Sequence, residues 1–270
     1  MGDQFLGRRV RLLGALGLAA ATAAACGGNG IVPAPSTLFT NVNACGAVSG
    51  VVTGDAAVVN GTACNGGTAA VALLLMKDKN GKDYGSCSGS VISATAVLTA
   101  AHCLHDIGSV TIAFGSREIQ AASFSYSPDY DPNRLDSIDV GVVIASSPLG
   151  QPIAPILSSR DATVGETVVI AGYGQSGLAS AGGTLRAGTV SVTKVGSVFL
   201  ETGAGVSGSG ACPGDSGGPA LVSVNGMWAV AGITSTLAGP CVVATNTFLS
   251  VRNATVRSFI LSKASDAAQR

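Results

Sequence analysis

Charged and aromatic side chains are scarce in this chain of 270 residues. Asp, Glu, Lys and Arg together make up 11% of the sequence, the formal net charge is zero, and aromatic residues supply 4%. A nucleic-acid-binding protein normally carries a basic face, so we expect no nucleic acid among the partners. Only two histidines and no Cys-x-x-Cys pair are present, which argues against a metal site of the zinc type.

Long apolar runs are missing after the first 26 residues. The apolar run Leu12–Ala25 follows three arginines, is too short to span a bilayer and ends in small residues, as a cleaved secretory signal does. The small residues before Cys26 also resemble a bacterial lipoprotein signal, in which the cysteine is lipidated. We expect a lipid on Cys26 and membrane anchoring through it; an ordinary cleaved signal with an incidental cysteine is the alternative. The remainder is expected to be exported, either secreted or anchored at the cell envelope.

Three segments are expected along the chain: a signal over residues 1–26, a linker or propeptide over 27–57, and one folded domain over 58–270. The middle segment is rich in Gly, Pro, Ser, Thr and Asn, so little independent structure is predicted there. The chain has seven cysteines. An exported chain favours disulfides, and assigning Cys26 to lipid leaves an even six.

Short apolar runs separated by Gly, Asn, Asp or Pro recur throughout the folded domain. Without intervening helical patterns they predict an all-β fold of antiparallel barrels or sandwiches. The predicted strands are Ala69–Met76, Ala96–Thr99, Val110–Phe114, Val140–Ile144, Thr167–Tyr173, Val190–Thr193, Ala220–Val224, Trp228–Thr234 and Thr247–Val251.

One late segment is predicted to be helical. Asn253 is a suitable N-cap, and Val256, Phe259 and Ile260 form an apolar face that ends near Ala264. Asn253 also begins a formal N-glycosylation sequon, but capping is the preferred interpretation at a helix start.

The segment Cys212–Pro219, which reads Cys-Pro-Gly-Asp-Ser-Gly-Gly-Pro, carries the strongest chemical signal. A serine hydroxyl becomes a nucleophile when a base removes its proton and donors stabilise the oxyanion that forms. Gly214 lets the backbone turn so that its N–H and that of Ser216 point at one oxygen. A glycine-rich turn with an unreactive serine is the alternative interpretation.

The base must be His102 or His105, the two histidines of the chain. His102 follows an apolar strand, whereas His105 is expected to be a solvated loop residue. The third group is a buried carboxylate that orients the imidazole. Asp139 opens an apolar strand and is preferred, with Asp136 as its competitor.

At these residues the chain resembles the trypsin–chymotrypsin family of serine proteases, in the family's order His, Asp, Ser. Thr99–Cys103 is similar to its histidine motif, Gly214–Pro219 is its serine motif unchanged, and Asp139–Val142 is similar to its aspartate motif with glycine for alanine. Cys87–Ile92 and Gly172–Gly174 resemble two further family segments. The resemblance spans about residues 58–262 and implies two six-stranded antiparallel barrels, followed here by the predicted C-terminal helix, with the catalytic groups in the cleft between the barrels.

The resemblance also implies two disulfides, Cys87–Cys103 and Cys212–Cys241. Cys45 and Cys64 are then left, and we expect them to pair across the start of the domain; two free thiols are the alternative.

Val58 looks like the family's mature N-terminus, whose α-amino group pairs with the aspartate before the nucleophile, here Asp215. We therefore expect a zymogen cut between Ala57 and Val58, with Asp215 buried and unpaired until the amine arrives. The alternative is a constitutively active enzyme in which Val58 merely starts a strand.

Substrate preference is predicted from the aligned pocket residues. Gly210 lies where trypsin-like enzymes carry Asp, so a preference for Arg or Lys is not expected. Ser235 matches a residue that hydrogen-bonds near the catalytic aspartate and the substrate backbone. Thr236, Leu237 and Asn246 replace smaller or different family residues. We expect small or medium uncharged residues before the scissile bond.

Together these features predict a monomeric serine endopeptidase that cleaves proteins or peptides by acyl transfer and needs no cofactor. The rival hypotheses are a binding protein that keeps the protease fold without turnover, and an esterase of another fold. The esterase would require alternating strands and helices, which the pattern lacks.

Overall fold

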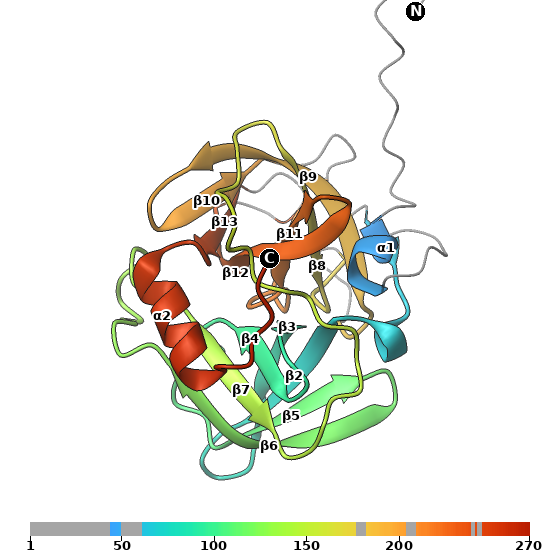
Figure 1. The fold of residues 1–270 in the computed structure, drawn as a ribbon. Helices are drawn as coiled ribbons and strands as arrows, with labels where there is room; N and C mark the ends of the chain where they lie inside the picture. Colours follow the sequence, from blue (N-terminus) through green and yellow to red (C-terminus); the bar gives the residue numbers. More distant parts are fainter. Residues whose placement is uncertain (1–43, 50–60, 177–181, 204–208, 239–240, 242–244) are drawn as a thin grey trace, which may run out of the picture. The chain divides into compact units, whose positions relative to one another are not determined.

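The computed structural model describes residues 44–49, 61–176, 182–203, 209–238, 241 and 245–270. Two closed antiparallel sheets account for most of them (Figure 1). The first barrel closes in the order β2-β3-β4-β7-β6-β5. Its strands are β2 (Val71–Lys77), β3 (Asp83–Val91), β4 (Ala96–Thr99), β5 (Ser109–Phe114), β6 (Arg117–Tyr126) and β7 (Gly141–Ala145).

The second barrel has the order β9-β10-β13-β12-β11-β8 and closes because β8 also pairs with β9. Its strands are β8 (Thr167–Gly172), β9 (Arg186–Val195), β10 (Phe199–Thr202), β11 (Pro219–Val224), β12 (Met227–Ala238) and β13 (Thr245–Ser250). The short β1 (Thr62–Ala63) adds to β9, and a single 3-10 turn, η2 (Gly66–Thr68), precedes β2. The predicted fold of two six-stranded antiparallel barrels is confirmed.

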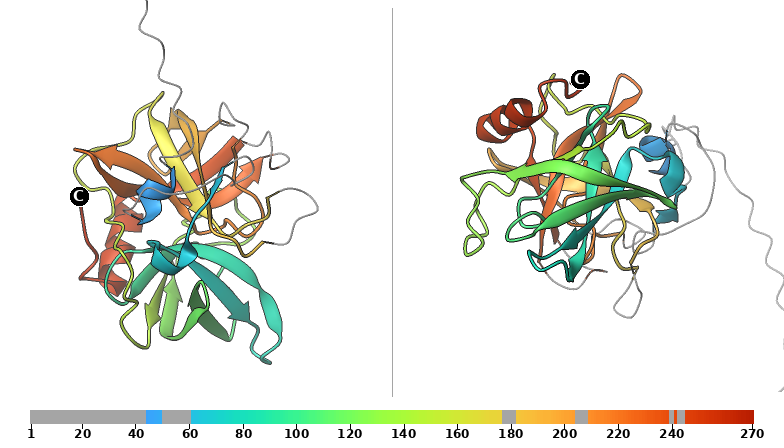
Figure 2. Two further views of the ribbon diagram at one scale, coloured as in Figure 1. Left: turned by 90° about the vertical axis from the view of Figure 1, so that its right-hand side faces the viewer. Right: turned by 90° about the horizontal axis from the view of Figure 1, so that it is seen from below.

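Buried apolar side chains fill both barrels. Leu74, Leu98 and Ile112 are fully buried in the first, as are Val230 and Phe248 in the second. The left view of Figure 2 shows the second barrel above the first. The segment that joins the barrels is bonded to both: the N–H of Ala154 donates to the carbonyl of Val91 in β3 at 2.8 Å, and Ile156 forms a parallel bridge with Val230 of β12.

Helix α2 (Ala254–Lys263) confirms the predicted C-terminal helix. The Oδ1 of Asn253 accepts hydrogen bonds from the N–H groups of Thr255 and Val256, at 3.0 and 3.2 Å. These are two of the N–H groups that a helix start leaves without a partner in the helix. The buried face consists of Val256, Phe259 and Ile260, as the sequence pattern indicated.

Helix α1 (Ala44–Ser49) differs from the prediction of little structure over residues 27–57. Ala44, Cys45 and Val48 are each at most 1% exposed, and the carbonyl of Val48 accepts from the N–H of Ala70 at 2.7 Å. The helix lies against the second barrel, in blue in Figure 2. Its burial and its disulfide supply a stability that the local composition does not reveal. None of the helices in the described ranges is long and apolar enough to cross a bilayer.

Candidate active site

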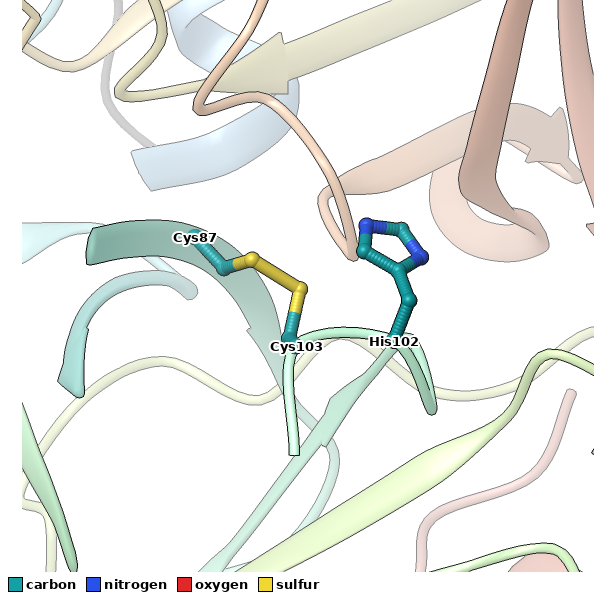
Figure 3. A group of neighbouring side chains, drawn as sticks. All are labelled: Cys87, His102 and Cys103. Atoms are coloured by element: carbon teal, nitrogen blue, oxygen red, sulfur yellow. A yellow bond between two sulfur atoms is a disulfide. The ribbon is translucent and has the colours of Figure 1, made fainter. Parts of the chain in front are cut away.

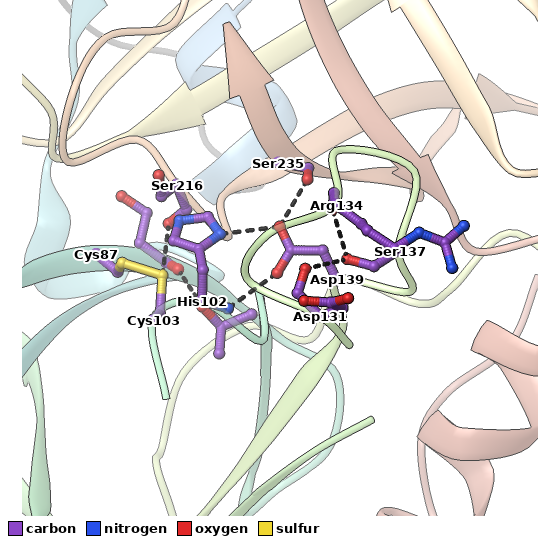
Figure 4. A network of polar contacts seen from close by, with 11 residues as sticks. Cys87, His102, Cys103, Asp131, Arg134, Ser137, Asp139, Ser216 and Ser235 are labelled. Atoms are coloured by element: carbon purple, nitrogen blue, oxygen red, sulfur yellow. Dashed lines mark hydrogen bonds and ion pairs between the residues drawn. A yellow bond between two sulfur atoms is a disulfide. The ribbon is translucent and has the colours of Figure 1, made fainter. Parts of the chain in front are cut away.

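His102 and Asp139 meet in the first barrel through two hydrogen bonds. His102 lies three residues after β4, and Asp139 lies two residues before β7, the strand that pairs with β4. The Nδ1 of His102 is 2.8 Å from Oδ2 of Asp139, and the backbone N–H of His102 donates to Oδ1 at 2.9 Å (Figure 4). A carboxylate only accepts, so we assign the proton to Nδ1, which leaves Nε2 as an acceptor.

The carboxylate of Asp139 is buried, with 5% of the residue exposed. Ser235 of β12 donates a third hydrogen bond, from Oγ to Oδ2 at 2.6 Å. Burial by itself would raise the pKa of Asp139, but the hydrogen bonds and charge interaction from His102, together with the Ser235 bond, lower that pKa below its ordinary value. Asp139 is therefore held ionised beside the imidazole.

The competing residues of the sequence analysis lie in other environments. Asp136 is exposed and is paired with Arg134. The ring of His105 contacts Tyr126 and Tyr130 edge-on, with centroids 5.7 Å away in each case. The structure thus brings Asp139, and not Asp136, against His102.

Ser216 lies in the loop that leads into β11 of the second barrel and is half-buried. Its carbonyl oxygen accepts from the N–H of Ser88 at 2.8 Å and is 3.8 Å from Sγ of Cys103. Figure 4 shows Ser216 beside the imidazole of His102, on the side away from Asp139. Among the described hydrogen bonds, none joins the Ser216 hydroxyl to His102.

The backbone around Ser216 leaves two N–H groups available. Gly214 has φ of 97°, a conformation that favours glycine, and a Cβ there would lie 2.9 Å from Cα of Gly174. The Pro213 carbonyl accepts from the N–H of Gln175 at 3.0 Å, so the Gly214 N–H of that trans peptide points the opposite way. In the described part of the chain the N–H groups of Gly214 and Ser216 have no hydrogen-bond partner.

Asp215 is buried beneath this loop and is not unpaired, in contrast to our expectation. Its two carboxylate oxygens accept from the N–H groups of Gly174 and Cys212, at 2.7 and 2.8 Å. Burial nevertheless raises the pKa of Asp215 to about 6, against the smaller lowering effect of these hydrogen bonds. Val58, its predicted activation partner, lies outside the described residues, as does Cys26.

Two predicted pocket residues lie together inside the second barrel. A Cβ at Gly210 would lie 2.5 Å from the carbonyl oxygen of Cys241. The fully buried Asn246 accepts from the N–H of Ala211 at 2.9 Å and donates to Oγ1 of Thr202 at 3.2 Å. Its amide therefore supports the backbone next to Gly210.

The other predicted pocket residues belong to β12. Thr236 and Ser235 line a cavity of about 170 Å³ together with His102 and Asp139. This cavity therefore has walls from both barrels. The backbone of Leu237 pairs with Asn246 in the β12–β13 ladder, while its side chain lies outside the described part.

The described residues contain three disulfides, with the predicted pairings. They join Cys45 to Cys64, Cys87 to Cys103, and Cys212 to Cys241. Cys87, His102 and Cys103 form a cluster of metal-ligating residue types (Figure 3). Because both sulfurs are in a disulfide, they offer no thiolate, and the cluster does not fit a metal site.

Sequence reasoning missed the role of Ser88, which is fully buried in β3. Its hydroxyl donates to the carbonyl of Gly214 and accepts from the N–H of Tyr173, both at 2.9 Å. The one sequence signal for this role was a polar residue directly after Cys87. Nothing in the local pattern identifies its partners, which lie 126 and 85 residues away.

The chain is similar to known proteins in both sequence and fold. A family model described as Trypsin matches residues 58–259. Trypsin beta of Drosophila erecta is 33% identical over 164 residues, which cover 51% of this chain and 64% of that protein. Vitamin K-dependent protein C of Rattus norvegicus is 27% identical, with coverages of 66% and 45%. The chain thus spans less than two thirds of the length of these two relatives.

A further relative and a solved structure are also similar to this chain. Brachyurin of Leptuca pugilator is 30% identical over 176 residues, which cover 55% of this chain and 74% of that protein. A solved structure titled HL collagenase has a TM-score of 0.63 at 20% identity, covers 80% of this chain, and is itself 99% covered; at this identity the match supports the fold alone. Because the family match extends over most of the chain, this protein belongs to the trypsin family of serine proteases.

Proposed function

We propose that this chain is a serine endopeptidase that hydrolyses proteins or peptides through an acyl-enzyme on Ser216. The observation that carries the proposal is the 2.8 Å contact between Nδ1 of His102 and the buried carboxylate of Asp139, beside Ser216 (Figure 4). The free N–H groups of Gly214 and Ser216 supply a second element of the same chemistry. The reaction requires no cofactor.

In the proposed mechanism Nε2 of His102 takes the proton of the Ser216 hydroxyl, which attacks the peptide carbonyl. The N–H groups of Gly214 and Ser216 donate to the oxyanion of the tetrahedral intermediate. Asp139 keeps the proton on Nδ1 and stabilises the imidazolium. His102 then protonates the leaving amine. Water next attacks the acyl-enzyme while His102 takes its proton, and His102 returns that proton to the departing oxygen of Ser216.

A second candidate function is binding of proteins without turnover. The observation that favours it is the missing hydrogen bond between the described Ser216 hydroxyl and His102. Such contacts are often long in enzymes without bound substrate, and all three catalytic residues are retained, so we prefer the enzyme.

A fluorophosphonate probe separates the two candidates, because it reacts only with an activated serine. The probe is added to the purified chain, both intact and cut before Val58 at an engineered protease site. We expect labelling that is lost in Ser216→Ala and falls by orders of magnitude in His102→Ala. His105→Ala, at the second histidine, is the matched control and should label normally. An unlabelled wild type that also leaves fluorescent casein intact refutes the endopeptidase.

For activation, we propose a zymogen that is cut between Ala57 and Val58, after which the new α-amino group pairs with Asp215. The buried carboxylate, with its raised pKa, supports this proposal, because a cation beside it would favour ionisation. After reduction of the disulfides, N-terminal sequencing of the larger fragment of the active protein should begin at Val58. Full activity with an intact Ala57–Val58 bond excludes the zymogen.

We also propose that α1 stays attached to the protease domain after cleavage. The Cys45–Cys64 disulfide supports this, since the two cysteines lie on either side of the proposed cut. With the proposed lipid on Cys26, the enzyme would remain at the cell envelope; without it, the enzyme would be secreted. Incorporation of labelled palmitate, abolished by Cys26→Ala, is the expected result. An unlabelled wild type rejects the lipid anchor.

We further propose cleavage after small or medium uncharged residues. The close approach of the Cys241 carbonyl to Gly210, and the absence of a carboxylate at position 210, support it. A peptide-library profile dominated by Arg or Lys before the scissile bond contradicts this preference.

A further inference from the structure

The loop that carries the nucleophile is held through its carbonyl groups. Four consecutive carbonyls each accept a hydrogen bond. The pairs are Pro213 with the N–H of Gln175, Gly214 with the Ser88 hydroxyl, Asp215 with the N–H of Gly218, and Ser216 with the N–H of Ser88. The distances lie between 2.8 and 3.0 Å. Ser88 therefore holds two of the four, one with its backbone and one with its side chain.

The direction of the Ser88 hydroxyl bond is fixed by its two partners. The N–H of Tyr173 only donates, so Oγ accepts from it, and the carbonyl of Gly214 only accepts, so the hydroxyl proton points to that carbonyl. Ser88 is fully buried, so water does not compete for either bond. The hydroxyl thus connects β3 of the first barrel to two segments of the second.

Gly214 is the residue whose conformation this bond controls. Glycine populates both signs of φ about equally, so its two flanking peptide planes need external constraints. The preceding plane is held by Gln175. The following plane is held by the Ser88 hydroxyl at its carbonyl, and by the Asp215 N–H, which donates to the Cys212 carbonyl at 2.9 Å.

We propose that Ser88 is a positioning residue for the oxyanion hole. Its side-chain hydroxyl keeps the N–H groups of Gly214 and Ser216, which have no partner among the described residues, aimed at one point. The inference rests on the proposed serine-protease function. Ser88 touches neither substrate nor the reacting atoms and acts through the Gly214 peptide. A preorganised donor acts on charge that develops in the transition state, so loss of the hydroxyl affects turnover rather than substrate binding.

The test compares Ser88→Ala with Ser90→Ala, an equally buried serine two residues further along β3 that has no described contact with Gly214. The probes are 4-nitrophenyl acetate and a fluorophosphonate. We expect Ser88→Ala to lower kcat and the phosphonylation rate about tenfold, with KM within twofold of the wild type. Ser90→Ala should keep both rates, and the urea midpoint of each variant measures any general loss of stability.

Four other outcomes contradict either the positioning role of Ser88 or the proposed function. Wild-type rates in Ser88→Ala remove the positioning role and leave the proposed function intact. Equal losses in both variants, or a rise in KM with kcat unchanged, assign Ser88 a purely structural role. A wild type that is inert to both probes, both intact and after cleavage before Val58, removes the proposed function itself. If Ser88→Ala does not fold, Ser88→Cys replaces it in the test, because a thiol nearly keeps the side-chain volume but is a weaker donor. A reduced phosphonylation rate in Ser88→Cys supports the positioning role, and a wild-type rate rejects it.

Discussion

Replacing Ser235 by alanine removes one of three hydrogen bonds to the Asp139 carboxylate. The bond is 2.6 Å long, and both residues are at most 9% exposed. A hydrogen bond to a charged group contributes about 1.5–3 kcal/mol, whereas one between neutral groups contributes about 1 kcal/mol. We therefore expect the free energy of unfolding of Ser235→Ala to fall by about 2 kcal/mol at pH 7.

The pH dependence gives this prediction its specific signature. The pKa of Asp139 is lower in the folded state than its ordinary value, so the carboxylate stabilises the fold above the unfolded pKa of about 3.9. That contribution is lost as the pH falls through the folded pKa. Once the pH is below the folded pKa, the carboxyl is protonated and the bond is neutral, so the deficit of Ser235→Ala should narrow to about 1 kcal/mol.

Urea unfolding at pH 7 and at a series of decreasing pH values below about 3.9, followed by the fluorescence of the single tryptophan, Trp228, measures both values. Ser137→Ala is the matched control, because its hydroxyl bonds the carbonyls of Asp131 and Arg134 and lines the same cavity. Its deficit should be the same at every pH. A deficit for Ser235→Ala that narrows nowhere in this acidic series refutes a charge-assisted bond to Asp139.

Three other perturbations have defined outcomes. Burial raises the folded pKa of Asp215 to about 6. The stability that its protonated carboxyl contributes below about pH 4 should therefore decline by on the order of 3 kcal/mol as the pH rises through 6. The urea midpoints of Asp215→Asn should not show this decline with pH. Gly217→Ala should lower stability by more than about 3 kcal/mol and abolish probe labelling, because its Cβ would overlap Oγ1 of Thr99. Gly165→Ala, also at positive φ but in open space, should lose only about 1–2 kcal/mol and label normally. Joint replacement of Cys45 and Cys64 by serine should lower the free energy of unfolding by about 3 kcal/mol, because their bridge closes a 19-residue separation, and a wild-type urea midpoint would contradict this.

The fold was readable wherever a strand is apolar and flanked by turn residues. Ala96–Thr99 was predicted with the bounds that β4 has, since all four residues are buried. β6 (Arg117–Tyr126) was missed because most of its residues are polar or exposed, and its place depends on pairing with β5 and β7. Helix α1 was missed because its stability comes from tertiary burial and a disulfide, not from local composition.

The site was predictable in its residue types but not in its connections. The motifs around His102 and Ser216 identified the residues that the structure brings together. The supports of the loop could not be read in the same way, since Ser88 bonds to segments distant in sequence. The family resemblance predicted that Asp215 has no partner before activation. The backbone N–H donors that it has, such as that of Gly174, leave no trace in the sequence.

Two neighbouring amides make the turn after β8 a reporter of the nucleophile loop. The N–H groups of Gly174 and Gln175 are bonded to Asp215 and Pro213 respectively. If the loop opens, both amide protons become free to exchange with deuterium together. One proteolytic peptide covering this turn would then record the opening by mass spectrometry, with no substrate, inhibitor or label on the active serine.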